Sequence, residues 1–408
     1  MKKVLTLLAA LLCGSAAFAQ ETPAKYSLYG FVRNYAVFDT RESSAGAQDL
    51  YFYMPKGVNL VDGKDVNAMP SFRMYSLTTR LGLKVAGYQF GATKVDGTVE
   101  ADFYSMNGAV AVLRMRQAYV GLGWDFSADS KLVLNIGQTW HPLAADMPHV
   151  TNLETGAPFN PFNRSPQVMA HYDIDGRFTL TGGFLFPMQY QPTGPEGKSS
   201  NYNKYALLPE AYLGLSYKEG GFLGRLGVNV LTIKPYYKAS GLMAAVTPML
   251  YLQYTDGMFQ IKGKSVLAQA GEHLNLLSGY GVSSYDADKD VYRYTPMQDW
   301  ASFVSVQYGK KFQVLGMLGY MKQLYATTDL LDAKDLLWLN TSADTSIHQA
   351  VRFTPTVVWN LGKLSFSLEY NLTAAQFGVG VRNIHGSFDD KGDWVLNHRF
   401  IWMTKFSF

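Results

Sequence analysis

The chain contains a single cysteine, Cys13, which lies among the first twenty residues. Those residues begin with two lysines, continue through the apolar run Val4–Leu12 and end in Ala17-Phe18-Ala19, the pattern of a secretory signal peptide. Leu12 is too large to precede a lipid-anchored cysteine, so we do not expect a lipoprotein. We predict a cleaved signal peptide at 1–19 and a mature domain at 20–408, which has no cysteine and cannot form disulfides.

Long apolar runs, charge blocks and linkers are also lacking. After the first twenty residues no apolar run approaches the roughly 18 residues that a membrane-spanning helix needs. Without Lys2 and Lys3 the basic count falls from 36 to 34, against 32 acidic residues, and no polybasic segment remains. Nucleic acid is therefore not an expected partner. No Pro-rich linker or shift in composition divides the chain, so we expect one architecture throughout.

The motifs of common enzyme sites are absent as well. The sequence has no Gly-x-Ser-x-Gly nucleophile elbow, no His-Glu-x-x-His zinc motif and no carboxylate pair that stands out. The seven histidines are scattered, and we interpret His141 and His149 as loop packing rather than a metal site. We expect no enzymatic activity, no cofactor and no metal.

Aromatic residues and alternating patterns are what the sequence does contain. Aromatics make up 14% of the chain, with 27 Tyr and 24 Phe. Between residues 75 and 85, Leu77, Leu81 and Leu83 alternate with polar residues that include Arg80 and Lys84. A period of two sends the two sets to opposite faces of a strand. A soluble sandwich would bury the apolar set, whereas a transmembrane barrel turns it toward lipid and carries aromatic girdles.

The C-terminus favours the barrel. Residues 394–408 read as one long strand with Phe400, Trp402, Phe406 and the final Phe408 on one face. A strand that ends the chain on an aromatic resembles outer-membrane barrel proteins, whose terminal Phe is part of the signal read by the barrel-assembly machinery. A soluble edge strand that ends in Phe by chance is the alternative. With the signal peptide, this predicts a location in the outer membrane of a Gram-negative bacterium, in contact with its lipid.

We predict an all-β fold, a transmembrane antiparallel β-barrel of about sixteen strands with long external loops. Pro355, inside one predicted strand, is a mild objection because proline cannot donate a ladder hydrogen bond. The predicted strands are 26–39, 72–90, 92–106, 109–125, 130–141, 167–175, 176–187, 204–218, 222–236, 242–256, 258–271, 298–310, 311–325, 347–361, 363–376 and 393–408.

One long loop is a candidate for narrowing the channel. The segment 142–167 holds five prolines and is third among the predicted external loops, the place where porins of this size fold a segment into the lumen. We expect Asp146, Glu154 and Arg164, with His141 and His149, to face the constriction. A loop that lies over the mouth of the barrel or in a subunit contact is the alternative.

Arg114 and Arg116 are the clearest charged pair, because residues two apart share one face of a strand. Exposing an arginine to lipid near the bilayer midplane costs about 2–4 kcal/mol, so this face belongs to the lumen. Excess basic side chains in a narrow pore concentrate anions. Alternatively, these arginines pair with Glu100, Asp102 and Glu369 and only stiffen the wall. The predicted pore-lining, anion-selecting residues are Arg80, Lys84, Arg114, Arg116, Arg164, Arg225, Arg352 and Arg399.

Three strings in this region carry a family resemblance. They are Arg114-Met115-Arg116-Gln117-Ala118-Tyr119-Val120-Gly121-Leu122, then Gly137-Gln138-Thr139-Trp140, then Asn163-Arg164-Ser165-Pro166-Gln167-Val168, with Tyr29-Gly30-Phe31 before them. In this order they resemble the DcaP-like trimeric porins of Gram-negative outer membranes. The match is specific over about residues 26–175 and rests on the barrel pattern beyond them.

The resemblance implies a homotrimeric, sixteen-strand diffusion channel that prefers small anionic solutes such as carboxylates, with Arg114, Arg116 and Arg164 facing the lumen. The short stretch between Gln20 and Tyr26 leaves no room for the helical periplasmic extension of some relatives. Two hypotheses remain. The first is a porin that passes small hydrophilic solutes by passive diffusion, without a cofactor. The second is a plugged outer-membrane barrel that acts as a surface binding or adhesion protein through loops 271–297 and 326–346.

Overall fold

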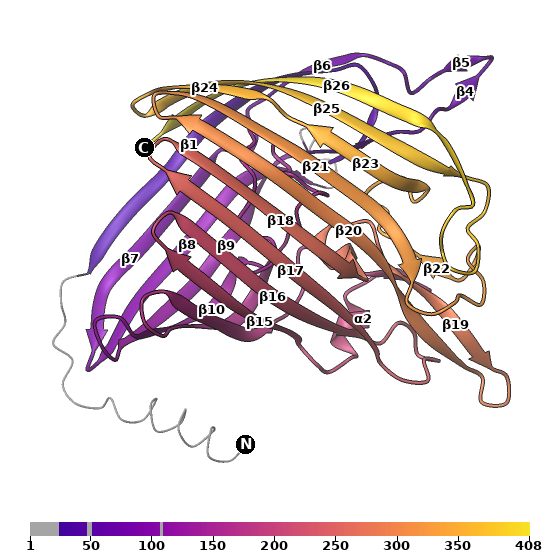
Figure 1. Ribbon diagram of the computed structural model, residues 1–408, viewed down its shortest axis with the longest axis horizontal. Helices are drawn as coiled ribbons and strands as arrows, with labels where there is room; N and C mark the ends of the chain where they lie inside the picture. Colours follow the sequence, from indigo (N-terminus) through magenta and orange to yellow (C-terminus); the bar gives the residue numbers. More distant parts are fainter. Residues whose placement is uncertain (1–23, 47–50, 107–108) are drawn as a thin grey trace.

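The computed structural model describes residues 24–46, 51–106 and 109–408. The predicted signal peptide at 1–19 and Cys13 lie outside the described residues. Within them, one antiparallel sheet of twenty strands closes on itself into a barrel (Figure 1). Two wall strands are each interrupted and therefore count twice among the twenty. Two more, β19 (Tyr280–Asp286) and β22 (Leu337–Trp338), pair beyond the wall, so the wall itself has sixteen strands. The predicted fold class is confirmed.

The wall strands follow the predicted ones closely, mostly within a few residues at each end. They are β1 (Lys25–Asp39), β6 (Ser71–Tyr75) continued by β7 (Arg80–Phe90), β8 (Thr93–Met106), β9 (Ala109–Asp125), β10 (Lys131–Trp140), β11 (Arg164–Asp173), β12 (Phe178–Leu185), β15 (Glu210–Glu219), β16 (Phe222–Ile233), β17 (Met243–Asp256), β18 (Phe259–Gln269), β20 (Val291–Gly309), β21 (Phe312–Ala326), β23 (Ile347–Phe353) continued by β24 (Thr356–Leu361), β25 (Leu364–Val379) and β26 (Asp390–Ser407).

Short elements lie in the long connections. They are β2 (Ser43–Gly46), β3 (Tyr51–Pro55), β4 (Leu60–Val61), β5 (Lys64–Asp65), β13 (Thr193–Gly194), β14 (Gly197–Lys198), the helix α2 (Asn201–Lys204) and the 3-10 helix η1 (Gly271–Leu274). No helix among the described residues is long and apolar enough to cross a membrane.

The barrel closes between its first and last strands. β26 pairs with β1 from Ser407 opposite Phe31 to Arg399 opposite Asp39. On its other side β1 pairs first with β7 and then with β6. Phe408, the predicted assembly signal, exchanges backbone hydrogen bonds with Gly30 at this seam.

The outer face is apolar, as a lipid-facing wall requires. Along β17 buried and exposed residues alternate almost without exception. Met249 and Tyr251 point inward and are buried, while Leu250 and Leu252 are 42% and 45% exposed. Exposed leucine, valine and aromatic side chains recur on the same outward face of the other wall strands. A barrel with this exterior fits a bilayer rather than water.

Leu77 corrects one detail of the predicted pattern. The wall strand breaks between β6 and β7, where Thr78 adopts a positive φ of 66°. The break turns Leu77 away from lipid, and it is buried with Tyr35 and Ile401. Pro355 interrupts its strand in the same way, since β23 ends at Phe353 and β24 begins at Thr356. Alternation is reliable only while the ladder runs unbroken.

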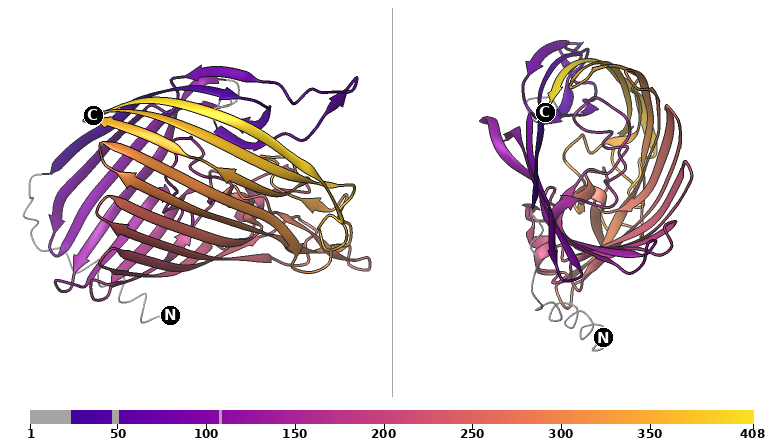
Figure 2. Two further views of the ribbon diagram at one scale, coloured as in Figure 1. Left: turned by 45° about the horizontal axis from the view of Figure 1, so that its top comes forward. Right: turned by 90° about the vertical axis from the view of Figure 1, so that its left-hand side faces the viewer.

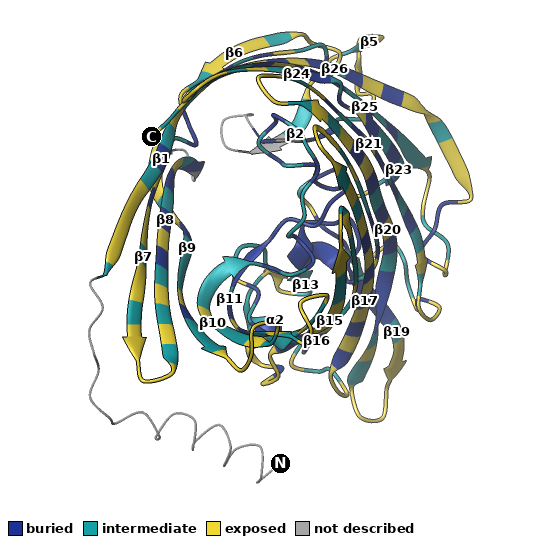
Figure 3. Cartoon of the chain, turned by 60° about the vertical axis from the view of Figure 1, so that its left-hand side comes forward, coloured by how far each residue is buried: buried dark blue, intermediate teal, exposed yellow. Residues whose placement is uncertain are grey.

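Parts of three loops fold into the barrel, and Figures 2 and 3 show chain inside the wall. We name the loops L1 (residues 40–70, described except for 47–50), L3 (141–163) and L6 (270–290). The inward parts are β3 of L1, the buried residues of L3 and residues 270–279 of L6, whereas β4, β5 and the tip of L6 are mostly exposed. Phe162 of L3 donates its backbone N–H to the carbonyl of Leu274 in L6 at 2.8 Å, and the Tyr53 hydroxyl of L1 donates to the carbonyl of Asn275. Their apolar side chains form a buried core that includes Tyr51, Tyr53, Phe159, Phe162, Leu274 and Leu276.

Candidate functional site

L3 is anchored to wall strands around much of the barrel. Asp146 pairs with Arg225 of β16 at 3.4 Å, and Glu154 pairs with Arg352 of β23 at 3.1 Å. The Lys264 ammonium of β18 donates to the carbonyl of Leu143 at 3.0 Å. In the wall β17 separates β16 from β18, and β20 and β21 separate β18 from β23, so a loop that reaches all three from inside must extend across the lumen. The predicted inward-folded third loop matches this arrangement.

Histidine and backbone contacts complete the anchoring. The Nε2 atom of His149 lies 2.7 Å from the side-chain oxygen of Gln260 on β18. Burial, followed by the charge of Lys262, lowers the pKa of His149 to about 4, so it is neutral near pH 7. The backbone N–H of Thr151 donates to Glu369 of β25 at 2.5 Å. Glu369 therefore holds the loop and does not neutralise the arginine face of β9.

Arg114 and Arg116 point into the lumen and are bound by two carboxylates of the neighbouring strand β8. Arg114 binds Asp102 through two nitrogens, at 3.0 and 2.9 Å. Arg116 bridges Glu100 at 2.8 Å and Asp102 at 2.9 Å. Register places these groups together, since Asp102 lies opposite Arg114 in the β8–β9 ladder. Arg80 of β7 joins them, 3.6 Å from Glu100.

Two further guanidinium groups in this region have no ion-pair partner among the described residues. Arg164 is 3% exposed, stacks on Trp140 at 4.7 Å and on Phe162 at 5.5 Å, and leaves its Nη1 without a hydrogen bond. Arg33 of β1 bonds only the hydroxyl of Thr78 through its guanidinium, at 2.6 and 3.1 Å. Buried polar groups are normally satisfied, so an orphan nitrogen points to a missing acceptor.

We call this set the arginine cluster: Arg33, Arg80, Arg114, Arg116 and Arg164. Five guanidinium groups face the two carboxylates Glu100 and Asp102, which leaves three positive charges uncompensated. Four of its members, Arg33, Arg80, Arg114 and Arg116, line a cavity of about 70 Å³ between L1, L3 and the wall. Arg164 is buried and stacks on two of the lining rings, and as the first residue of β11 it belongs to the wall and not to the constriction loop. The cavity is lined by Arg33, Tyr51, Arg80, Tyr104, Arg114, Arg116, Trp140, Asn152, Leu153, Thr155 and Phe162.

The other predicted pore-lining residues are distributed along the lumen. Lys84 is exposed, with its ammonium over the ring of Tyr29. Arg225 borders a second cavity of about 530 Å³, toward the end of the barrel with the short turns. The prediction that Arg352 and Arg399 line the pore is wrong, because their side chains are buried, with 0% and 1% exposure. L1 and L3 cover Arg352, and Arg399 lies 3.9 Å from Asp39, so neither lines open water.

Sequence reasoning missed Arg33 and the aromatic lining of the cavity. Arg33 lies two residues from both Phe31 and Tyr35, on the lumen face of β1, so strand alternation could have found it. Tyr104, Trp140 and Phe162 carried no such signal, since aromatic residues occupy both faces of this barrel. Sequence reasoning also missed L6, since residues 271–279 fold into the lumen instead of forming an outer binding loop.

No family model and no curated protein matches the chain. Solved structures do. The outer membrane channel DcaP of Acinetobacter baumannii superimposes with a TM-score of 0.65 at 20% identity, over 96% of this chain and 100% of that chain. This is the fold of an outer-membrane barrel. The outer membrane protein OmpT of Vibrio cholerae matches with a TM-score of 0.54 at 13% identity, over 96% of this chain and 100% of that chain. The expected likeness to a DcaP channel is confirmed for the fold.

Proposed function

We propose that the chain is a porin of the Gram-negative outer membrane that lets small hydrophilic solutes diffuse passively and prefers anions such as carboxylates. The observation that carries this proposal is the arginine cluster, with three uncompensated charges beside the loop that narrows the lumen. Guanidinium groups give charge-assisted hydrogen bonds to carboxylates. A conducting site must hold its solute weakly enough to release it.

The pairing of Arg114 and Arg116 with Glu100 and Asp102 refines the proposal. A cation held by a carboxylate contributes little net field, so we assign most of the anion preference to Arg33, which lines the cavity, and less to the buried Arg164. Arg80, Arg114 and Arg116 then position the cluster and compensate the two carboxylates. Lys84 adds positive charge at a wider part of the lumen, whereas Arg225 is paired with Asp146.

We also propose a homotrimer, assembled with the help of the barrel-assembly machinery. A trimer form of OmpT of Vibrio cholerae superimposes on this chain with a TM-score of 0.50 at 13% identity. Phe408, at the end of β26, is the proposed assembly signal. Three linked pores would close in three equal conductance steps.

Single-channel recording with reversal potentials in a salt gradient tests this proposal. We expect Arg33→Gln to lower the anion-to-cation permeability ratio by roughly fivefold, because one unit charge about 4 Å from a solute is worth about 1 kcal/mol in water. Arg114→Ala and Arg116→Ala should also lower the ratio, because each leaves Asp102 or Glu100 short of a counter-ion. Lys289→Gln, which removes a cation 77% exposed at the tip of an external hairpin, is the matched control. Equal ratios in the Arg33 and Lys289 variants would contradict the anion assignment.

A second candidate is supported by the filled lumen. L1, L3 and L6 bury a common apolar core inside the barrel, which is what a plugged barrel that serves as a surface binding or adhesion protein would have. Such a protein would conduct little while remaining folded. A heat-modifiable, folded barrel that is silent in the bilayer would favour this candidate over the porin.

A further inference from the structure

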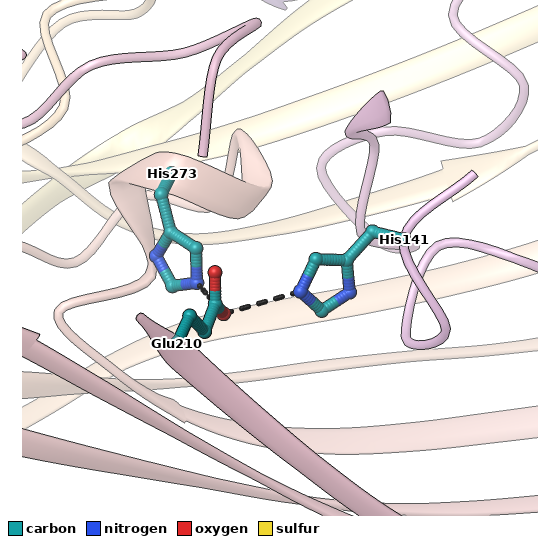
Figure 4. Close-up of side chains that lie close together, drawn as sticks. All are labelled: His141, Glu210 and His273. Carbon is teal, nitrogen blue, oxygen red and sulfur yellow. Dashed lines mark hydrogen bonds and ion pairs between the residues drawn. The ribbon is translucent and has the colours of Figure 1, made fainter. Parts of the chain in front are cut away.

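Three buried side chains from distant parts of the chain meet at the mouth of the lumen, where L3 and L6 touch the wall. Figure 4 shows His141 at the start of L3, Glu210 at the start of β15 and His273 in η1 of L6. All three are at most 1% exposed. Nε2 of His141 lies 3.1 Å from Oε1 of Glu210, and Nε2 of His273 lies 2.9 Å from the same oxygen. One carboxylate therefore joins both loops to the wall.

The hydrogen bonds fix where the protons lie. Nδ1 of His141 accepts the backbone N–H of Leu143 at 3.1 Å, so its proton is on Nε2, which donates to Glu210. Nδ1 of His273 lies 3.2 Å from the carbonyl oxygen of Ala270, which can only accept. Nε2 of His273 faces a carboxylate oxygen that already receives the Asn229 amide and His141. Both ring nitrogens of His273 must donate, so His273 is an imidazolium.

The same bonds argue against a metal ion, although the three side chains could supply ligands within 4.8 Å of one another. A histidine that binds a metal through Nε2 carries its proton on Nδ1 and donates it to an acceptor. In His141 this nitrogen instead accepts an N–H.

Around His273 the charges favour its protonated form. Glu210 faces it from β15, Glu272 lies next to it in η1, and neutral His141 faces it from L3. Lys198 lies 3.9 Å from Glu272. Burial alone would lower the pKa of His273, but Glu210 and the Ala270 carbonyl overcome it, and the pKa lies above its usual 6.5.

We propose that His273, Glu210 and His141 form a proton-dependent clasp that holds L3 and L6 in the lumen, and that loss of the His273 proton releases L6. This inference rests on the proposed porin function, since it makes L6 a pH-controlled obstruction of the channel. Deprotonation would set a nitrogen lone pair against either the Glu210 oxygen or the Ala270 carbonyl, and would remove the positive charge that faces the buried carboxylate, which is costly. The next residues, Leu274 and Asn275, bind Phe162 and Tyr53, so the disturbance reaches the core of the lumen.

The direction follows from linkage. A histidine whose folded pKa is raised stabilises the closed arrangement fully below pH 6.5, and this contribution is lost as the pH rises through the folded value. L6 should therefore be held at acidic and neutral pH and freed at alkaline pH. Between the two pKa values the ratio of closed to open L6 falls about tenfold per pH unit.

Two measurements on the refolded full chain in detergent test the clasp. The first is the ¹⁵N imidazole spectrum of histidine-labelled protein from about pH 5 to about pH 9, the range in which histidines titrate. We expect His273 to be doubly protonated at neutral pH while His149 is neutral. The second is hydrogen exchange of residues 270–279 in the wild type relative to Glu210→Gln at each pH, which cancels the intrinsic pH dependence of exchange.

We expect wild-type L6 to exchange more slowly than the Glu210→Gln protein below the His273 titration, and the two to converge above it. His149→Gln removes a histidine of L3, the loop that also carries His141, and should keep the wild-type pattern. A neutral His273 at pH 6 overturns the clasp, and the wild-type spectrum decides this even if Glu210→Gln does not fold. Zinc that shifts both His141 and His273, with wild-type affinity lost in Glu210→Gln, also overturns it in favour of a metal site.

Conductance measurements distinguish a failure of the proposed clasp from a failure of the proposed porin function. If His273 titrates with L6 opening and conductance rises over the same pH range, both stand. If the titration and L6 opening occur in a barrel that is silent at every pH, the clasp stands and the porin fails. A conducting channel whose L6 does not respond to the His273 titration contradicts the clasp alone.

Discussion

Arg352 and Glu154 show how a charged residue can face the lumen without meeting solute. Both are 0% exposed and lie 3.1 Å apart, and the arginine also donates to the carbonyl of Ala157 at 2.9 Å. Burial raises the pKa of Glu154 to about 7 even with Arg352 beside it. This pair attaches L3 to β23. It fixes the position of the loop and does not select ions.

We expect Arg352→Met to destabilise the barrel by about 3–5 kcal/mol at neutral pH, because it leaves Glu154 buried without its partner. A carboxyl whose folded pKa is raised contributes fully below its ordinary value of 4.5 and loses that contribution as the pH rises through about 7. The deficit of the variant should therefore grow with pH. Urea unfolding in detergent, read by heat-modifiability on a gel, measures it. The double variant Arg352→Met/Glu154→Gln should recover much of the loss, and a deficit unchanged by the second substitution would contradict this reading.

Strand β1 closes the barrel, because it pairs with β26 on one side and with β6 and β7 on the other. Gly30 lies where these strands meet. A Cβ atom there would collide with the backbone oxygen of Arg80 and with the ring of Phe408. The absence of a side chain lets the last residue of the chain pack onto the first strand.

Gly30→Ala should cost about 1–3 kcal/mol through this overcrowding and lower the yield of heat-resistant folded barrel. Gly316→Ala in β21 is the control, since its Cβ would meet only Val306 at an ordinary 3.6 Å. Equal midpoints of thermal unfolding for the two variants would refute the steric role of Gly30.

At the scale of the whole molecule, the width of a sixteen-strand wall matters less than what fills it. L1, L3 and L6 occupy much of the lumen, and the arginine cluster keeps a cavity of only about 70 Å³. Conductance should therefore depend on loops more than on the wall.

Replacement of residues 272–277 of L6 by a short Gly-Ser linker should raise single-channel conductance severalfold while the barrel stays folded, because the buried end of L6 would leave the lumen. An equal shortening at the exposed hairpin tip, residues 286–290, should leave conductance near the wild-type value. A loss of folding in the first variant alone would mean that L6 is a structural plug, as in the surface-binding alternative.

The sequence by itself determined the wall. Period-two alternation, short turns and a terminal aromatic strand were enough for the number of strands and nearly all of their positions, because each strand faces lipid on one side and the lumen on the other. Alternation also predicted that Arg114, Arg116 and Arg225 face the lumen. It failed at Leu77, where a broken ladder changes the phase without a marker in the sequence.

Only the tertiary structure decided what fills the lumen and which charges are free. Whether an arginine meets a solute depends on partners such as Glu100, Asp102 and Glu154, and these come from register and from loops that fold across the barrel. The meeting of His141, Glu210 and His273 likewise joins segments with no relation in the sequence. Local periodicity reports only which face a residue occupies, whereas loop packing and ion pairing depend on distances between residues that are far apart along the chain.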